Sequence, residues 1–305
     1  MTTRQTSAAI QRDPALGRIL ERYLAKELSG PVALMQLLIE TEDFDAVRSL
    51  VGELARDPDS AARAKELEEL LVANAEGCAR IATMLKADVD SPRPAQSVEE
   101  GIAFSERLFD WSVQQSEEAS VALYSLGNPE LLDRATSEIV DQLKAWGTIN
   151  RNTVLLDLGC GIGRMLSALA PDIKTATGID VSSRMVAAAK RRCASYSNLT
   201  VSKADGRGLG EFPDGSFDVV LAVDSFPYIR QSGYELAKRF FAESHRVLHP
   251  GGELVVLNYS YSDDDGADRQ EVADFAANHG FNVVVSGERP FKLWDGLAFR
   301  LTTRM

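Results

Sequence analysis

The sequence predicts an α/β fold, in which a mostly parallel β-sheet with flanking helices follows a smaller all-helical domain. A short apolar run at Val154–Leu158 leads directly into a glycine-rich turn, and such a run is typical of a strand buried on both faces. Further strand-like segments then alternate with helical ones, as parallel strands joined by crossover helices do. Before residue 95 the apolar residues instead recur at helical spacing.

The first part of the chain is expected to be a helical domain over residues 1–94. Its apolar residues repeat at helical spacing in three stretches, Leu16–Leu24, Ala46–Leu54 and Leu67–Leu85. The segment Asp88–Pro94 has the composition of a linker. Helical periodicity reports burial and not purpose, so two interpretations stay open. The domain is either a substrate lid or dimerisation element, or an extension that only stabilises the fold.

Two start signals predict the helices between this domain and the sheet. Ser97 and Glu100 have the spacing of a capping box, which opens a helix that continues through Trp111. Asn128 followed by Pro129 predicts the start of a second helix.

The glycine-rich turn is the strongest local signal in the chain. Gly159, Gly161 and Gly163 follow the predicted strand without a spacer. Glycine suits a turn that needs unusual backbone angles and a close approach of the ligand, because it has no Cβ to clash. Cys160 lies inside the turn, where a small packing residue is a better interpretation than a nucleophile.

Acidic residues follow the next strand-like segments. The segment Thr175–Asp180 ends in a carboxylate, 17 residues after Gly163, which can accept hydrogen bonds from both hydroxyls of a ribose. Leu199–Ser202 leads to Asp205, and Asp218–Val223 leads to Asp224. A further strand is expected at 253–257, followed by a helix at 268–280. Two closing strands, at 281–285 and 294–303, complete the sheet.

These residues carry a resemblance to a known family. From about Asn128 to Arg304 the chain resembles the class I S-adenosylmethionine-dependent methyltransferases. The family's acid-x-Gly-x-Gly-x-Gly pattern is present from Asp157 to Gly163, its ribose-binding acid matches Asp180, and its adenine-contacting acid matches Asp205. The stretches 212–218 and 246–252 resemble the family's sequences before its fourth and fifth strands.

The resemblance implies a Rossmann-like sheet of seven strands, with S-adenosylmethionine across the carboxyl ends of the strands. Residues 95–305 then form the methyltransferase domain, of which 128–305 are the core and 95–127 a candidate lid. The implied cofactor-binding residues are Asp157, Gly159, Cys160, Gly161, Gly163, Asp180, Val181, Asp205, Gly206 and Asp224.

A nicotinamide-dependent oxidoreductase is the main competitor for the same residues. Its fingerprint is Gly-x-Gly-x-x-Gly, whose third glycine packs the helix against the strand. Here the third glycine comes one residue early, and Arg164 occupies the fingerprint position. The tighter spacing suits a ligand without a pyrophosphate, so the methyltransferase is favoured.

A sulfonium cofactor asks little chemistry of the protein, because its methyl group is already electrophilic. Catalysis is then mostly alignment and exclusion of water, with a general base only where the nucleophile is protonated. Asp224 and Tyr228, in the loop after the fourth strand, are the candidates to orient or deprotonate the acceptor. The alternative for each is a capped loop or a packed ring. Candidate substrate contacts are Tyr124, Phe226, Tyr259 and Tyr261.

Composition limits the partners. The net charge is −12, and residues 1–94 carry 12 basic against 16 acidic groups, so neither part has the basic footprint of a nucleic-acid binder. No apolar run is long enough to span a bilayer, and three widely spaced cysteines suggest reduced thiols. We expect a cytoplasmic protein with no membrane partner. Asp263–Asp265 reads as a solvated acidic loop, and no metal is assigned.

The sequence therefore predicts methyl transfer from S-adenosylmethionine to a small molecule, with the acceptor atom (nitrogen, oxygen or carbon) unresolved. A second class of function stays open, in which the helical domain docks a protein partner. The protein would then modify proteins or act as a catalytically weak, cofactor-binding regulator. A homodimer formed through the same domain is a further expectation.

Overall fold

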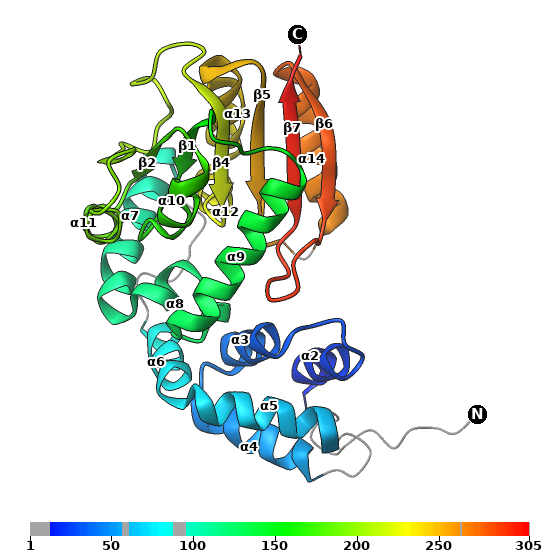
Figure 1. The fold of residues 1–305 in the computed structure, drawn as a ribbon. Coiled ribbons are helices and arrows are strands. Elements are labelled where there is room, and N and C mark those ends of the chain that lie inside the picture. The colour runs from blue at the N-terminus through cyan, green and yellow to red at the C-terminus, as the bar shows by residue number, and fades with distance from the viewer. Residues whose placement is uncertain (1–12, 57–60, 88–95, 263, 305) are drawn as a thin grey trace. The chain divides into compact units, whose positions relative to one another are not determined.

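The computed structural model describes residues 13–56, 61–87, 96–262 and 264–304. These residues form two compact units (Figure 1). The first unit holds the described residues up to 87 together with Gln114–Ala135 and Lys292–Asp295, and the second holds most of the remainder. The linker expected at Asp88–Pro94 lies outside the described residues. The domain boundary expected at residue 94 stays a prediction.

The first unit is helical, as its apolar spacing predicted. Its N-terminal helices are α2 (Pro14–Leu24), α3 (Gly30–Thr41), α4 (Phe44–Ala55), α5 (Ala61–Ala73) and α6 (Ala75–Lys86). Helix α3 falls outside the three predicted stretches because it is apolar on most sides and lacks a polar face that would mark its period. Leu34 and Leu37 of this helix are fully buried.

Two later segments of the chain pack within this first unit. Helix α8 (Glu117–Val121) and the short 3-10 helix η1 (Leu123–Ser125) lead to Leu126, whose carbonyl oxygen would lie 1.9 Å from a Cβ added to Gly77. Only a glycine therefore lets α6 approach this backbone. Trp294, from the end of the chain, stacks on Tyr124 with ring centroids 5.9 Å apart.

The second unit is built on a sheet of seven strands, in the order β3-β2-β1-β4-β5-β7-β6. The strands are β1 (Val154–Leu158), β2 (Thr175–Asp180), β3 (Leu199–Lys203), β4 (Phe217–Val223), β5 (Leu248–Leu257), β6 (Phe281–Glu288) and β7 (Ala298–Thr303). Strands β1 to β5 pair in parallel, while β7 runs antiparallel to both β5 and β6. This arrangement confirms the predicted seven-stranded, mostly parallel sheet.

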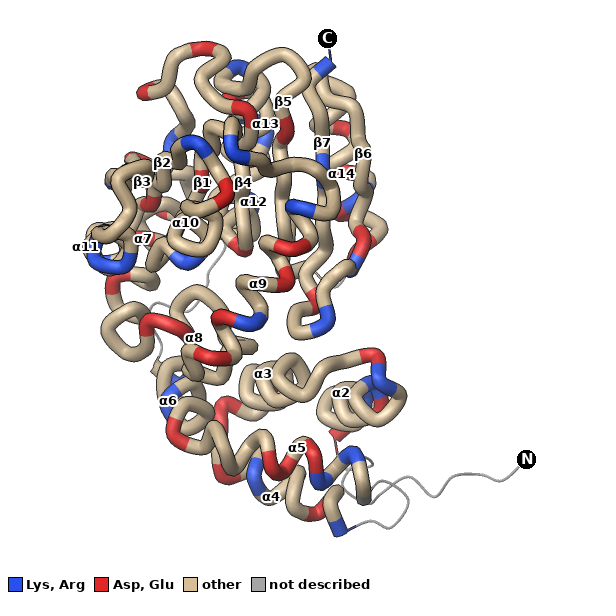
Figure 2. The backbone as a smooth tube through the Cα atoms, viewed as in Figure 1, with Lys and Arg blue, Asp and Glu red and all other residues tan. Residues whose placement is uncertain are grey.

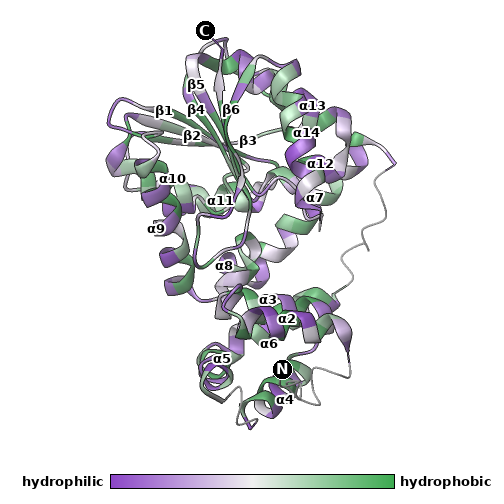
Figure 3. Cartoon of the chain, turned by 90° about the vertical axis from the view of Figure 1, so that its right-hand side faces the viewer, coloured by the Kyte–Doolittle hydropathy of each residue, from purple (hydrophilic) through white to green (hydrophobic). Residues whose placement is uncertain are grey.

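Helices cover both faces of this sheet. The helices that belong wholly or partly to this unit are α7 (Val98–Gln115), α9 (Pro129–Ala145), α10 (Arg164–Leu169) with the 3-10 turn η2 (Ala170–Asp172), α11 (Ser183–Arg192), α12 (Phe226–Ser232), α13 (Tyr234–Val247) and α14 (Asp265–Asn278). Figure 3 shows the apolar strands between α10 on one side and α13 with α14 on the other. The loop expected after the fourth strand contains α12, which has Pro227 in its first turn.

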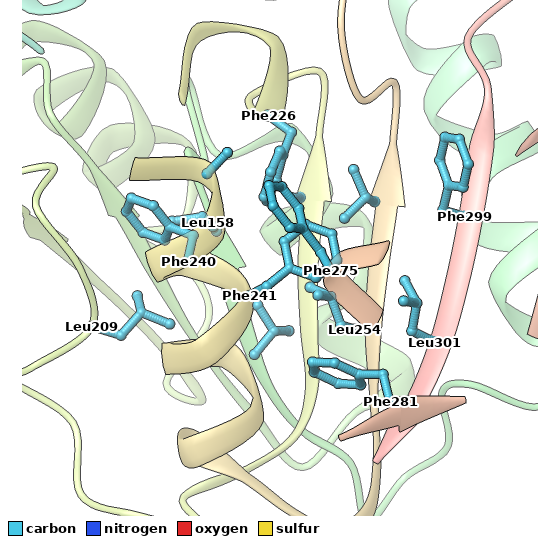
Figure 4. Close-up of a cluster of buried hydrophobic side chains, with 14 of the residues drawn as sticks. Leu158, Leu209, Phe226, Phe240, Phe241, Leu254, Phe275, Phe281, Phe299 and Leu301 are labelled. Atoms are coloured by element: carbon cyan, nitrogen blue, oxygen red, sulfur yellow. The ribbon is translucent and has the colours of Figure 1, made fainter. Parts of the chain in front are cut away.

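The core of the second unit lies between the sheet and helices α13 and α14. Phe241 of α13 packs against Phe275 of α14 and Phe281 of β6, with ring centroids 5.0 and 6.4 Å apart (Figure 4). Leu254 and Phe299 of the central strands are fully buried beside them. This packing fixes the strands whose carboxyl ends carry the predicted site. Among the described residues, no helix is both long and apolar enough to cross a membrane.

The caps agree with the sequence signals. Ser97 Oγ accepts a hydrogen bond from the Glu100 backbone N–H at 3.1 Å, while the Glu100 carboxylate accepts from the Gln96 N–H and not from that of Ser97. Asn128 Oδ1 accepts from the N–H of Glu130 at 2.8 Å, and so caps the start of α9.

Removing the Asn128 cap should destabilise the first unit. Asn128→Ala deletes the bond to Glu130 and also the bond that Asn128 donates to Asn74 Oδ1 at 2.7 Å. We expect the free energy of unfolding to fall by about 1–2 kcal/mol in urea denaturation. The exposed Asn152→Ala is the matched control and should change it by less than about 0.5 kcal/mol. Equal stability of the two variants would contradict the assigned cap.

Candidate functional site

The candidate site lies where the parallel strands end. Strands β1 to β5 are parallel, so their carboxyl ends meet at one edge of the sheet. Strand β1 lies between β2 and β4, which places the reversal of strand order beside β1. Open α/β sheets bind ligands at such a reversal. The glycine turn follows β1, and Asp180, Asp205 and Asp224 stand at or just after the ends of β2, β3 and β4.

The glycine turn needs its glycines for two separate reasons. Gly159, Gly161 and Gly163 all have left-handed backbone angles, with φ of 73°, 53° and 75°. A Cβ on Gly159 would lie 2.4 Å from Cβ of Ser225, whose hydroxyl donates to the Leu158 carbonyl at 2.6 Å. The turn after β1 is therefore held directly against the residue that follows Asp224.

Asp180 fastens the glycine turn to the end of β2. Its side chain is 8% exposed. Oδ2 accepts from the Gly161 N–H and Oδ1 from the Ser182 N–H, both at 2.9 Å. Burial raises the pKa of this carboxyl to about 6, although both of these N–H groups favour the charged form. The predicted ribose-binding acid is thus fixed in place by the turn that precedes α10.

Asp157 adds a second buried carboxyl beneath the same turn. It is 2% exposed, and its Oδ2 has no hydrogen-bond partner among the described residues. Burial raises the pKa of Asp157 to about 7, with the Arg164 guanidinium acting against this rise and the Asp180 charge adding to it. A buried polar atom without a partner is costly, so this oxygen is suited to a ligand that brings a donor.

Three other predicted cofactor residues, Val181, Asp205 and Gly206, lie just after the ends of β2 and β3, and Cys160 lies in the glycine turn after β1. Val181 contacts Gly206 so closely that a Cβ there would lie 2.9 Å from Val181 Cγ1. Asp205 is exposed, and its Oδ1 accepts from the Arg207 N–H at 2.8 Å. Cys160 is buried, and burial raises the pKa of its thiol well above the ordinary value. Burial therefore favours the neutral thiol, as expected of a packing residue.

Helix α7 runs along the ends of these strands. No sequence motif predicted its individual contacts there. Asp110 Oδ1 accepts from the Ser182 hydroxyl at 2.6 Å and from the Arg184 N–H at 3.0 Å. Glu106 forms an ion pair with Lys203, at the end of β3. Phe109 meets Tyr228 edge to face, with ring centroids 4.7 Å apart. The helix thus contacts the segments that follow β2 and β4 as well as β3.

Asp224 stands at the centre of a polar and aromatic group after β4 and β5. Its backbone is left-handed, with φ of 57°, and so is that of Asn258, with φ of 68°. Asp224 Oδ1 accepts from the Asn258 side-chain amide at 2.7 Å and from the Tyr261 hydroxyl at 3.1 Å. Such backbone strain in residues other than glycine concentrates at functional sites.

Two tyrosines complete this group. The Tyr261 hydroxyl lies 3.5 Å from that of Tyr228, and their rings meet edge to face with centroids 5.6 Å apart. Burial and the nearby Asp224 carboxylate raise the pKa of Tyr228 to about 12. Asp268 holds the loop that carries Tyr261, because its carboxylate accepts hydrogen bonds from the hydroxyls of Ser260 and Ser262 at 2.7 and 3.1 Å.

The other candidate substrate residues have different surroundings. Phe226 is buried and packs against Phe241 and Tyr259. The Tyr259 ring is buried, and its hydroxyl donates to the Glu271 carboxylate, which also holds Arg230. Tyr124 belongs to the first unit. Tyr261 joins the Asp224 group through its hydrogen bond to Oδ1. The roles of the other three candidates stay predictions.

The described residues of the acidic loop after β5 take part in a helix cap and an ion pair. Within 13–56, 61–87, 96–262 and 264–304, no group of three or more His, Cys, Asp or Glu side chains could hold an ion. Asp263 lies outside the described residues. Asp264 caps α14 by accepting from the Ala267 N–H, and Asp265 pairs with Arg289.

Glycine substitutions should separate steric closeness from backbone strain. Gly159→Ala introduces both a close contact with Ser225 and a strained left-handed backbone angle. We expect the free energy of unfolding to fall by about 2–4 kcal/mol. Gly147→Ala has the left-handed angle with open space around it and should lose about 1–2 kcal/mol. Gly210→Ala meets neither obstacle and should change stability by less than about 1 kcal/mol. Urea denaturation gives the ranking, and an equal loss in all three would refute the assigned contact with Ser225.

The buried carboxyls should make the ligand-free protein lose stability as pH rises. Because the pKa of Asp157 is raised to about 7, the folded state binds more protons than the unfolded state between about pH 4 and 7. Stability then falls through this window by up to about 1.4 kcal/mol per pH unit for one group.

Replacing Asp157 should remove this dependence. We expect the stability of Asp157→Asn relative to that of wild type to be greater at pH 8 than at pH 5, as measured by urea denaturation. The exposed Asp214→Asn is the control and should track wild type. A difference between Asp157→Asn and wild type that does not change with pH would exclude Asp157 as the titrating group.

The sequence is similar to those of known methyltransferases. The family model described as a methyltransferase domain matches residues 156–256. A demethylmenaquinone methyltransferase of Tropheryma whipplei is 36% identical over 107 residues, which are 35% of this chain and 42% of that protein. A 2-methyl-6-phytyl-1,4-hydroquinone methyltransferase of Synechocystis is 35% identical over 131 residues, which are 42% of this chain and 39% of that protein. A ribosomal RNA large subunit methyltransferase of Streptomyces coelicolor is 36% identical over 133 residues, covering 41% and 33%.

The fold has a solved counterpart. A phosphoethanolamine N-methyltransferase of Haemonchus contortus, in complex with phosphoethanolamine and S-adenosylhomocysteine, superposes with a TM-score of 0.56 at 15% identity. The match covers 68% of this chain and 50% of that one. The chain spans about two fifths of the length of the curated relatives it matches first. The sheet order and the glycine turn after β1 agree with these matches, which show that residues 156–256 are similar to a methyltransferase domain.

Proposed function

We propose that the second unit binds S-adenosylmethionine and transfers its methyl group to a small-molecule acceptor. The observation that carries the proposal is the glycine turn fastened to Asp180. Three left-handed glycines leave room for a close ligand, and a buried carboxylate stands beside them. The names of the quinone-type relatives, and the family match over residues 156–256, support the same reaction.

The residues present fit this cofactor. The unpartnered Oδ2 of Asp157 is a buried acceptor beneath the turn, as a nucleoside with donor groups requires. Asp180 is suited to the ribose hydroxyls and Asp205 to the adenine amino group, while Val181 and Gly206 form an apolar contact between the two. When bound, the cofactor supplies an electrophilic methyl group on a sulfur that is also the leaving group.

The protein's own contribution is position and exclusion of water. Helix α7 lies across the segments after β2 and β4 through Asp110 and Phe109, and we infer that it covers the bound cofactor. In this proposal, α7 is the part of the candidate lid 95–127 that covers the cofactor. Asp224 and Tyr228 follow β4 beside Ser225, which touches Gly159. They are the residues placed to orient the acceptor.

A small molecule is a better acceptor than a nucleic acid on electrostatic grounds. The net charge of −12 opposes binding of a phosphate backbone. Figure 2 shows acidic and basic residues interspersed along the described parts of both units, with one short basic run, Lys190–Arg192, at the end of α11. The similarity to the ribosomal RNA enzyme is confined to 41% of this chain, so it supports the domain and not its substrate.

The first unit is the basis of the second candidate function. Its helices carry exposed apolar side chains, Ile39 and Val72, at 45% and 69% exposure. A protein partner or a second copy of the chain would be recognised through this unit, and the alternative roles in protein modification or regulation depend on it. The three cysteines are buried free thiols, which supports a reducing, cytoplasmic location.

The cofactor can be tested by calorimetric titration with S-adenosylmethionine, S-adenosylhomocysteine and NAD in parallel. We expect micromolar binding of the two sulfur nucleosides and none of NAD. Binding of NAD alone would overturn the proposal in favour of an oxidoreductase.

Asp180→Ala should weaken S-adenosylhomocysteine binding about 10- to 100-fold, because a hydrogen bond to a charged group is worth roughly 1.5–3 kcal/mol. Asp214→Ala, which removes an exposed carboxylate that pairs with Arg246, is the control and should leave the affinity unchanged. Circular dichroism verifies that both variants are folded. Unchanged affinity in a folded Asp180→Ala protein would remove Asp180 from the site.

A further inference from the structure

Helix α7 precedes the predicted methyltransferase core, yet it contacts the ends of two of the strands that carry the candidate site. Asp110 contacts the segment after β2, and Glu106 pairs with Lys203 at the end of β3. Ile102 Cγ2 would lie 3.0 Å from a Cβ added to Gly206. Ile102, Glu106 and Asp110 are spaced four residues apart, so they share one face of the helix. This face of α7 therefore meets the segments that we assign to the nucleoside.

Asp110 makes the most specific of these contacts. Its Oδ1 accepts from the Ser182 hydroxyl at 2.6 Å and from the Arg184 N–H at 3.0 Å. Ser182 is the N-cap of α11 and is fully buried, and its hydroxyl oxygen accepts from the Met185 N–H at 3.0 Å. The first turn of a helix leaves such N–H groups without partners inside the helix. Asp110 therefore completes the cap of α11 from a distant part of the chain.

Ser182 connects Asp110 to Asp180. The Ser182 N–H donates to Asp180 Oδ1 at 2.9 Å, while its hydroxyl donates to Asp110. Asp180 Oδ2 accepts from the Gly161 N–H at 2.9 Å. Each oxygen of an ionised carboxylate can accept a further hydrogen bond, so two ribose hydroxyls would take the positions that remain. The direction of the Asp180 carboxylate therefore depends on where Ser182 is held.

This arrangement places two carboxylates on either side of one serine, against electrostatic preference. Burial is the main cause that raises the pKa of Asp180 to about 6, and the Asp110 charge adds to the rise. Like charges repel, so an uncharged side chain at position 110 would remove this term. Departures from the rules that stabilise a fold are expected at functional sites. The position of Asp110 is therefore better explained by the site than by stability.

We propose that Asp110 is a positioning residue of the cofactor site, which acts through Ser182 to hold the Asp180 carboxylate in the direction that both ribose hydroxyls need. The inference rests on the proposed function, because it names a residue that shapes the same site. The observation that carries it is the hydrogen-bonded chain from Asp110 through Ser182 to Asp180. Asp110 acts at a distance and needs no contact with the cofactor.

The ribose hydroxyls distinguish this role from a purely structural one. A residue that only stabilised the fold would change the affinity for all nucleosides of similar shape by the same factor. If Asp110 positions Asp180, its loss should instead weaken a ligand with both hydroxyls more than a ligand that lacks one of them. The preference for ribose over deoxyribose is therefore the quantity to measure.

The test is calorimetric titration with S-adenosylhomocysteine and its 2′-deoxy analogue. We expect wild type to prefer S-adenosylhomocysteine about tenfold or more, because the analogue leaves a charged acceptor without one donor. Asp110→Ala should bind S-adenosylhomocysteine about fivefold or more weakly than wild type and keep a preference of about threefold or less. A folded Asp110→Ala protein with the full ribose preference overturns the inference.

A conservative variant and a control isolate the hydrogen bond. Asp110→Asn keeps an oxygen that can accept from Ser182 and Arg184, so its affinity should stay within about threefold of wild type, with most of the ribose preference retained. Asp274→Ala removes an exposed helix carboxylate, which accepts from Gln270 at 2.9 Å, and should leave both quantities unchanged. A loss in Asp110→Asn as large as that in Asp110→Ala would contradict a role exerted through this hydrogen bond.

A double-mutant cycle tests the route through Ser182. Ser182→Ala removes the same link from its other end, so the double variant with Asp110→Ala should lose about as much ribose preference as either single variant. Circular dichroism first verifies that each variant is folded. Losses of preference that multiply in the double variant would show that the two residues act independently, and would overturn the proposed chain.

The titrations also separate this inference from the proposed function. If wild type fails to bind S-adenosylhomocysteine, the proposed function fails. If wild type binds it with a ribose preference that Asp110→Ala retains, only the positioning role fails. If wild type binds both nucleosides equally, Asp180 does not recognise the ribose and the positioning role fails with it.

Discussion

The site depends on one constraint, the burial of two carboxyls against a turn that only glycine can form. Asp180 accepts from the Gly161 N–H and Asp157 lies beneath the same turn, and burial raises the pKa of both groups. Burial disfavours both charges unless donors are present, and Asp157 Oδ2 has no hydrogen-bond donor among the described residues. These buried carboxyls therefore lower the stability of the folded protein at this edge of the sheet. A nucleoside with hydroxyl and ammonium donors would supply the missing hydrogen bonds.

We assign the two halves of the proposed reaction to different strands. The ends of β1, β2 and β3 supply the glycine turn, Asp180 and Asp205, which suit a nucleoside, while the ends of β4 and β5 supply Asp224 and Tyr261, which suit an acceptor. Ser225 joins the halves by its contact with Gly159. The order of the sheet reverses beside β1. The glycine turn after β1 therefore lies next to residues that follow β4, although the two are far apart in sequence.

The sequence was sufficient for the features that depend on local rules. The glycine turn, the acid at the end of β2 and the seven-stranded sheet follow from spacing, strand periodicity and family resemblance, and the structure agrees. Contacts across long separations could not be predicted. Asp110 reaches Ser182 across 72 residues, and the hydrogen bond from Tyr261 to Asp224 spans 37. The Tyr259 ring is buried in the core, whereas the Tyr261 ring two residues later is exposed. The sequence alone did not distinguish these two tyrosines.

The most direct test of the central claim is a crystal structure of the protein with S-adenosylhomocysteine bound. We predict that both ribose hydroxyls lie within hydrogen-bond distance of the Asp180 carboxylate, that the nucleoside follows the turn from Gly159 to Gly163, and that its sulfur faces Asp224 and Tyr228. A nucleoside bound away from Asp180, or with its sulfur directed away from the end of β4, would contradict the account.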